Sequence, residues 1–147
     1  MIQRAVEEKL HYLRTGPYYT HGCYDKLVFR KIAAILGGQV RYMITGSAPI
    51  DVSVLEFLKI CFCCTFFEGY GLTETSAAGS ITWANDPILG HVGGPLPCIK
   101  WRLLDLPEMN YLSTDKPYPR GELCFKGKSV TSGYFKRKDK TDEAFDS

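Results

Sequence analysis

Two stretches of sequence, lying about twenty residues apart, decide the fold. Residues 40–49 read VRYMITGSAP, and residues 65–75 read TFFEGYGLTET. Each begins as a short run of β-branched and aromatic residues, which is typical of a strand, and continues into a loop of small residues. Apolar residues at helical spacing precede each run, over residues 24–36 and 51–62. The order helix, strand, helix, strand predicts a parallel α/β layer.

Working outward, the same periodicity predicts a further helix over residues 2–13, ended by the glycine at position 16. Gly37 is expected to end the second helix in the left-handed conformation. Asp51 is a candidate to cap the third, and Ser53 with Glu56 offers a competing capping-box register. The residues expected on the buried faces are Ile2, Ala5, Val6, Leu10 and Leu13, then Val28, Ile32, Ile35 and Leu36, then Val54, Leu55, Leu58, Cys61 and Phe62.

Beyond Ser80 the pattern changes to short strand-like runs separated by turn residues. Strands are expected over residues 81–83, 99–104 and 122–126, and a solvated charged helix over 136–146. We therefore expect a partial α/β layer over residues 1–80. Residues 81–147 are expected to form a β-rich portion of the same domain, truncated at its C-terminus.

Composition restricts the class of protein. Of the 147 residues, 45% are hydrophobic and 23% charged, and the net charge is +2. These values are ordinary for a globular protein and exclude a disordered tail, a collagen-like chain and a coiled coil. The balanced charge argues against a nucleic-acid partner. No apolar run reaches the length of a membrane span, and the six cysteines are expected to be buried structural thiols.

The loops after the two strands carry the candidate site. Loops leaving the carboxyl ends of neighbouring parallel strands face one crevice, where ligands bind. Small residues at Gly46, Ser47 and Ala48 would admit a flat base, and Tyr70 offers an aromatic face for stacking. The Thr73 hydroxyl can donate a hydrogen bond to a phosphate oxygen, and the Glu74 carboxylate can bind Mg²⁺. Each feature also has an ordinary interpretation: a turn before a helix, a packed aromatic, or a helix cap with a first-turn acid.

Residues 70–75, reading YGLTET, resemble the signature of the adenylate-forming superfamily, which includes acyl-CoA synthetases, luciferases and peptide-synthetase adenylation domains. Residues 121–127 and the pair Gly133-Tyr134 resemble a later motif of that superfamily. Residues 24–29, 90–98, 107–111 and 114–117 are similar to long-chain fatty acyl-CoA synthetases in particular.

The resemblance implies part of the large N-terminal, AMP-binding domain of such an enzyme, which converts a long-chain fatty acid, ATP and CoA into acyl-CoA through an acyl-adenylate. It also implies that the partial α/β layer over residues 1–80 is a nucleotide-binding layer. Thr73 and Glu74 would be catalytic, with Glu74 as the Mg²⁺ ligand. The acyl chain would pass Ala77, Ala78 and Gly79. The nucleotide-binding residues that it implies are Gly46, Ser47, Ala48, Pro49, Glu68, Gly69, Tyr70, Gly71, Leu72 and Thr73.

Several parts of the family pattern are not found in the sequence, namely the phosphate loop, the Thr-Gly-Asp motif and the mobile C-terminal domain. We therefore expect an internal part of a longer enzyme that is inactive in isolation. Two alternatives stay open: a non-catalytic adenine-nucleotide-binding module, and an adenylating ligase for another carboxylic acid. The resemblance further implies an intracellular protein, with peripheral association at the cytoplasmic face of the endoplasmic reticulum, peroxisome or outer mitochondrial membrane.

Overall fold

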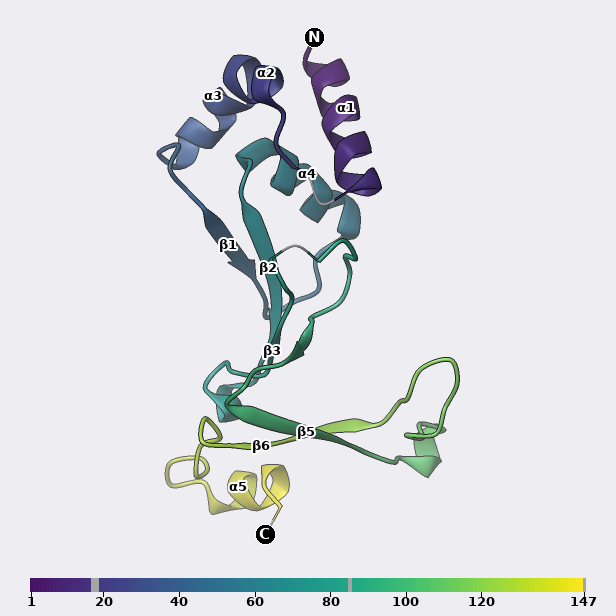
Figure 1. The fold of residues 1–147 in the computed structure, drawn as a ribbon. Coiled ribbons are helices and arrows are strands. Elements are labelled where there is room, and N and C mark those ends of the chain that lie inside the picture. The colour runs from purple at the N-terminus through teal and green to yellow at the C-terminus, as the bar shows by residue number, and fades with distance from the viewer. Residues whose placement is uncertain (17–18, 85, 147) are drawn as a thin grey trace. The chain divides into compact units, whose positions relative to one another are not determined.

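The computed structural model describes residues 1–16, 19–84 and 86–146. The chain divides into two compact units, each built from two separate stretches (Figure 1). The first unit comprises Met1–Gly69 and Ile81–Gly94, and the second comprises Tyr70–Ser80 and Pro95–Ser147. The mixed α/β fold class predicted from the sequence is confirmed.

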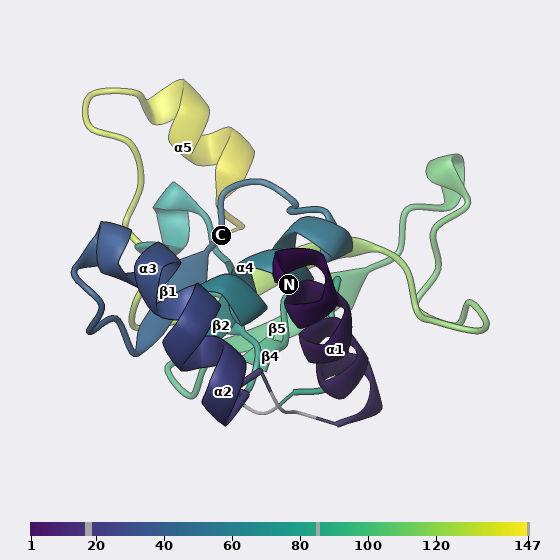
Figure 2. The same cartoon turned by 90° about the horizontal axis from the view of Figure 1, so that it is seen from above.

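Three helical segments surround the core of the first unit. Helix α1 (Ile2–Thr15) packs against α4 (Val52–Phe62), as both views show (Figures 1 and 2). The Asp51 carboxylate accepts a hydrogen bond from the Ser53 amide at 2.8 Å and so caps α4 as predicted.

The predicted second helix is irregular along its length. Its successive parts are α2 (Gly22–Tyr24), the π-helical turn η1 (Asp25–Phe29), α3 (Arg30–Ala33) and the 3₁₀ turn η2 (Ala34–Leu36). It ends at Gly37, whose φ of 82° is left-handed as predicted.

Strands β1 (Tyr42–Thr45) and β2 (Thr65–Tyr70) pair in parallel, with Tyr42 opposite Thr65 and Thr45 opposite Glu68. The sheet order is β1-β2-β3-β4, where β3 (Ser80–Ile81) and β4 (Gly94–Pro95) are only two residues long. Two predictions here were wrong. Strand β2 continues three residues beyond the expected position 67, and the strand expected over 81–83 ends at Ile81.

The core of the first unit forms two clusters around α4. One contains Ala5, Val28, Phe29, Ile60 and Cys61, and the other Leu55, Cys64 and Phe66. Burial raises the pKa of the Cys61 thiol to about 11, so this thiol stays protonated at neutral pH. All six cysteines are free, but Cys23 and Cys98 are exposed, which corrects the expectation that all are buried.

Four residues expected on buried faces are exposed instead: Ile2, Ile35, Leu36 and Val54. Helical periodicity identifies the apolar side of a helix, but it does not show over which residues a neighbouring element covers that side. Ile35 and Leu36 lie in η2, whereas the main contacts of α4 are with α1, η1 and α3. Ile2 is the first residue of α1.

A charged side chain lies inside the first core cluster. The Lys9 ammonium, 1% exposed, donates to the Asp25 carboxylate and to the Ile60 carbonyl, both at 2.6 Å. It also lies 3.1 Å from the Cys63 sulfur and 4.1 Å from the centre of the Phe29 ring. A buried cation is tolerated only with such partners, so Lys9 ties α1 to η1 and α4.

The second unit is organised around the antiparallel pair β5 (Ile99–Leu104) and β6 (Glu122–Gly127). Strand β5 has the predicted limits, and β6 ends one residue beyond the predicted position 126. The connection between them contains the short turn η4 (Pro107–Met109). Helix α5 (Lys138–Ala144) is shorter than the expected charged helix. In the described part of the chain, no helix is long and apolar enough to cross a membrane.

Replacing Lys9 with Met should lower the free energy of unfolding by about 3–5 kcal/mol, because it leaves the Asp25 carboxylate without its buried partner. The matched control is Lys138→Met, which breaks an exposed pair with Asp142 and should leave stability almost unchanged. Urea denaturation of both variants measures the difference. Equal effects of the two substitutions would contradict the structural role of Lys9.

Acid should destabilise the contact between α1 and α4. The Arg14 guanidinium makes two hydrogen bonds to Glu56, at 2.6 and 2.9 Å, and lowers the pKa of that carboxyl despite its burial. The pKa of Glu56 is lower in the folded state than in the unfolded state, where it is about 4.3. The ion pair therefore stabilises the fold above about pH 4.3, and this stabilisation is lost as the pH falls through the folded-state pKa. Urea denaturation at a series of pH values between neutral and acid should show this loss of unfolding free energy. In the Arg14→Gln variant the unfolding free energy should fall less between neutral and acid pH.

Candidate functional site

The loop after β1 lies beside the end of β2, within the first unit. Because Thr45 pairs with Glu68, the two strands reach their carboxyl ends at the same level. A Cβ atom added at Gly46 would lie 3.0 Å from the Gly69 carbonyl oxygen, so a larger residue there would press on β2. Residues 46–49 are exposed, and Ser47 has a left-handed φ of 67°. The prediction that the two strands are parallel neighbours is therefore confirmed.

Glu68 holds the loop that returns to the sheet. It is 9% exposed, and its carboxylate accepts a hydrogen bond from the Gly90 amide at 3.3 Å. Its amide donates to the Thr82 hydroxyl at 3.0 Å, and its carbonyl accepts from the Thr82 amide at 2.9 Å. These bonds explain why β2 continues past residue 67. The Glu68 side chain is thus engaged inside the unit.

In the second unit, the motif residues form a tight turn closed on itself. A Cβ atom at Gly71 would lie 2.2 Å from the Ala77 carbonyl oxygen, and one at Gly79 would lie 2.3 Å from the Tyr70 carbonyl oxygen. Only glycine allows such close approaches. The small residues predicted to border an acyl chain therefore have a packing reason as well.

The short 3₁₀ turn η3 (Thr73–Thr75) fixes the centre of this motif. The buried Thr75 hydroxyl accepts from the Leu72 amide at 3.0 Å and donates to the Leu72 carbonyl at 3.1 Å. Ser76 and Ala77 both have left-handed backbones, which are costly for residues with a side chain. The turn presents Thr73 to solvent.

The ring of Tyr70 packs within the second unit. It stacks on Phe125 with the ring centres 6.1 Å apart and the planes 27° apart, and Phe125 meets Trp101 edge to face. Tyr70 nevertheless keeps 37% of its surface exposed. Its ring is thus oriented by β6 while still offering surface for a contact.

Glu74 accepts hydrogen bonds both at its backbone and at its side chain. Its carbonyl accepts a hydrogen bond from the Thr131 amide at 2.7 Å, and its carboxylate oxygen Oε1 accepts one from the Tyr134 hydroxyl. The neighbouring Ser76 hydroxyl donates to the Ser129 carbonyl at 3.0 Å. Sequence analysis noted Tyr134 in a family motif but gave it no role, because no local spacing relates it to Glu74.

The residues present are compatible with Mg²⁺. In the described part of the chain, the second carboxylate oxygen of Glu74, Oε2, has no hydrogen-bond partner. No cluster of three or more His, Cys, Asp or Glu side chains there could hold a metal on its own. Mg²⁺ is commonly bound by one or two carboxylates together with substrate phosphates, so a single carboxylate with one oxygen not engaged in a hydrogen bond is a suitable donor.

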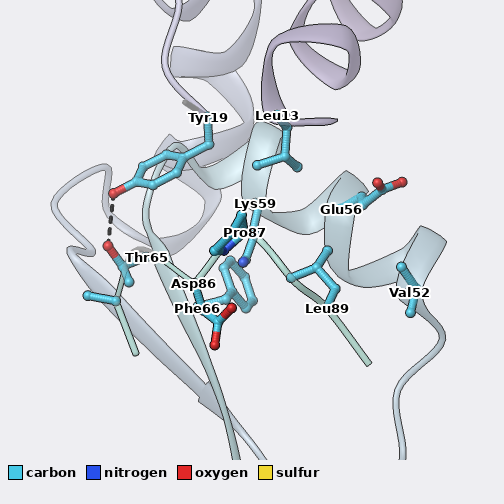
Figure 3. Close-up of a pocket in the computed structure, with 11 residues that line it drawn as sticks. Leu13, Tyr19, Val52, Glu56, Lys59, Thr65, Phe66, Asp86, Pro87 and Leu89 are labelled. Carbon is cyan, nitrogen blue, oxygen red and sulfur yellow. Dashed lines mark hydrogen bonds between the residues drawn. The ribbon is translucent and has the colours of Figure 1, made fainter. Parts of the chain in front are cut away.

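A pocket of about 150 Å³ lies elsewhere in the first unit, between α1, α4, β2 and the segment after β3 (Figure 3). None of the predicted site residues lines it. Its lining residues are Leu13, Tyr19, Val52, Glu56, Lys59, Thr65, Phe66, Ala84, Asp86, Pro87 and Leu89.

Several polar groups of this pocket have partners, either in the lining or next to it. The Tyr19 and Thr65 hydroxyls lie 2.8 Å apart, and Glu56 is held by Arg14. Burial lowers the pKa of Lys59, which the carboxylates of Glu68 and Asp86 partly oppose. The sequence signal for this pocket was weak, since Glu56 and Lys59 have the ordinary helical spacing of a surface ion pair.

Comparison with solved structures defines the class of protein. The adenylation domain of carboxylic acid reductase from Segniliparus rugosus, solved with AMP and a carboxylic acid, matches 97% of this chain and 22% of its own, with a TM-score of 0.61 and 27% identity. The corresponding domain from Mycobacterium chelonae gives the same TM-score at 32% identity, over 85% of this chain and 18% of its own. The fold is that of an adenylating domain.

Sequence comparison names the family. The model of the AMP-binding enzymes matches residues 4–135, and the chain belongs to that family. It is 48% identical over 139 residues to fatty acyl-CoA synthetase A of Dictyostelium discoideum, covering 95% of this chain and 20% of that protein. Long chain acyl-CoA synthetase 7, peroxisomal, of Arabidopsis thaliana is 50% identical over an alignment that covers 84% of this chain and 18% of that protein. Human long-chain-fatty-acid–CoA ligase 1 is 42% identical over 99% of this chain and 20% of that protein. The chain thus spans about a fifth of these relatives.

Gly71→Ala should destabilise the motif turn, because the new methyl group would overlap the Ala77 carbonyl. We expect a loss of about 1–3 kcal/mol in unfolding free energy, together with faster amide exchange at Leu72 and Thr75. Gly22→Ala is the matched control, since no atom lies within 4 Å of its Cβ position. Unchanged amide hydrogen exchange at Leu72 and Thr75 in Gly71→Ala would show that the turn tolerates a side chain.

Proposed function

We propose that these residues form part of an enzyme that activates long-chain fatty acids with ATP and CoA. Membership of the AMP-binding enzymes and the similarity to three named long-chain or fatty acyl-CoA synthetases support the substrate class. The observation that carries the proposal is the motif turn, which holds Glu74 with one carboxylate oxygen free of hydrogen bonds in the described part of the chain and Thr73 exposed beside it.

The proposed reaction has two steps. The fatty acid carboxylate attacks the α-phosphorus of ATP and forms an acyl-adenylate with release of pyrophosphate. The CoA thiol then attacks the acyl carbon and displaces AMP, which yields the thioester. Both steps belong to the whole enzyme, of which this chain contributes one part of the nucleotide site.

Within this proposal, Gly46, Ser47, Ala48 and Pro49 border the adenine. Tyr70 contacts the base with its exposed surface, and the backbone of Glu68, Gly69, Gly71 and Leu72 shapes the site around it. The close packing supports a backbone role for Gly46 and Gly71, since a side chain at Gly46 would press on the Gly69 carbonyl and Gly71 has no room for one.

Thr73 and Glu74 are proposed to act on the phosphates. The Thr73 hydroxyl donates to an oxygen of the α-phosphate, where negative charge accumulates during attack. Bound Mg²⁺ would supply positive charge between the phosphate oxygens, and Glu74 would hold it through Oε2. Ala77, Ala78 and Gly79 follow at the proposed passage of the acyl chain.

An intracellular location and a peripheral membrane association also belong to this proposal. The Arabidopsis relative is named as a peroxisomal protein, and that location is a property of the relative.

The complete protein containing these residues should exchange pyrophosphate into ATP in the presence of a long-chain fatty acid and Mg²⁺. Glu74→Gln should lower this rate by at least about tenfold, since it removes the metal ligand, and Thr73→Val by a comparable factor. Removal of Mg²⁺ by a chelator should abolish exchange. Lys126→Gln, an exposed change on β6, serves as the control.

Two results would overturn the proposal in different ways. Exchange with short-chain or aromatic acids but not with long-chain acids would keep adenylation and replace the substrate. Binding of Mg²⁺-ATP without any exchange would favour a non-catalytic nucleotide-binding module.

A further inference from the structure

The contact between Glu74 and Tyr134 joins residues that are sixty positions apart in the sequence. Both belong to the second unit. Glu74 lies in the η3 turn, and Tyr134 lies between β6 and α5. The Tyr134 hydroxyl is a neutral donor directed at a carboxylate, and such hydrogen bonds to a charged acceptor are among the stronger ones in proteins.

Tyr134 is held on its own side by residues in the middle and at the end of α5. Its amide donates to the Thr141 hydroxyl at 2.9 Å, and that hydroxyl donates to the Arg137 carbonyl at 3.0 Å. The Tyr134 ring meets Phe145 edge to face, with centres 6.4 Å apart. Gly133 has a φ of 132°, and a Cβ atom there would lie 2.5 Å from the Thr141 side chain. The position of the ring is therefore set by four local constraints.

Glu74 is held separately through its backbone. The Thr131 amide binds the Glu74 carbonyl at 2.7 Å, and the Ser76 hydroxyl binds the Ser129 carbonyl at 3.0 Å. Segment 129–134 thus contacts the motif turn three times, twice near the backbone of Glu74 and once at its carboxylate. The backbone contacts fix the position of the Glu74 main chain. Among the described residues, only the Tyr134 hydroxyl forms a hydrogen bond with the Glu74 carboxylate and so fixes its orientation.

We propose that Tyr134 is a positioning residue, which orients the Glu74 carboxylate so that Oε1 is engaged and Oε2 is directed to the metal bound on the nucleotide phosphates. This inference rests on the proposed function. A glutamate side chain without such a donor samples several rotamers, and ordering it on binding costs conformational entropy. A donor already in place removes part of that cost, as partners of metal ligands generally do.

The test compares the complete protein with the variants Tyr134→Phe and Glu74→Gln and with the double variant. Tyr134→Phe removes the hydroxyl and keeps the ring on Phe145. Tyr118→Phe is the matched control, because Tyr118 is 77% exposed and its hydroxyl has no hydrogen bond in the described part of the chain. Two readouts are used: Mn²⁺ binding in the presence of ATP, by water-proton relaxation, and the Mg²⁺ dependence of pyrophosphate exchange.

We expect Tyr134→Phe to weaken Mn²⁺ binding in the ATP complex, and to raise the Mg²⁺ concentration for half-maximal exchange, by about tenfold. The maximal rate at saturating Mg²⁺ should recover. In the Glu74→Gln background the same substitution should have no further effect, because Tyr134 acts only through Glu74. Tyr118→Phe should match the unmodified protein.

Three outcomes would overturn the inference: Tyr134→Phe behaves like Tyr118→Phe, its effect is equally large in the Glu74→Gln background, or the unmodified protein binds no Mn²⁺ with ATP. Failure of the proposed function looks different. In that case the unmodified protein binds Mn²⁺ with ATP and shows the Tyr134 effect, but forms no adenylate from a long-chain fatty acid.

Discussion

The parallel pairing of β1 with β2 is the constraint on which the first part of the candidate site depends. Because Thr45 lies opposite Glu68, both strands end at one level, and the Gly46 backbone meets that of Gly69. A shift of one residue in this register would turn every side chain of β2 to the opposite face. Glu68 secures the register from the other side, through its bonds to Thr82 and Gly90.

Local patterns were sufficient to predict most of the secondary structure. Capping by Asp51, the left-handed Gly37 and the limits of β5 all follow from short-range chemistry, and each is confirmed, while β6 extends one residue beyond its predicted end. The errors occur where distant residues decide. Strand β2 continues to Tyr70 because Thr82 pairs with Glu68, and Ile35 is exposed because its segment passes beyond the contact with α4.

The same division applies to the candidate site. Thr73 and Glu74 could be selected from residue chemistry and motif, since a hydroxyl and a carboxylate beside small residues suit a metal-bound phosphate. Tyr134 could not be assigned a role in this way, because its partner is sixty residues away and only the folded second unit brings them together. The buried Lys9 was also missed: on a helical wheel a lysine reads as solvated, and burial becomes acceptable only when Asp25 and the Ile60 carbonyl are in place.

The two units are interleaved along the chain, and this has a consequence for how the protein is made and cut. The backbone passes from one unit to the other at three peptide bonds, after Gly69, Ser80 and Gly94. Neither unit is therefore a contiguous segment that a gene fusion could carry or a single proteolytic cut could release. During synthesis, the first unit also stays incomplete until Gly94 has left the ribosome, after part of the second has already emerged.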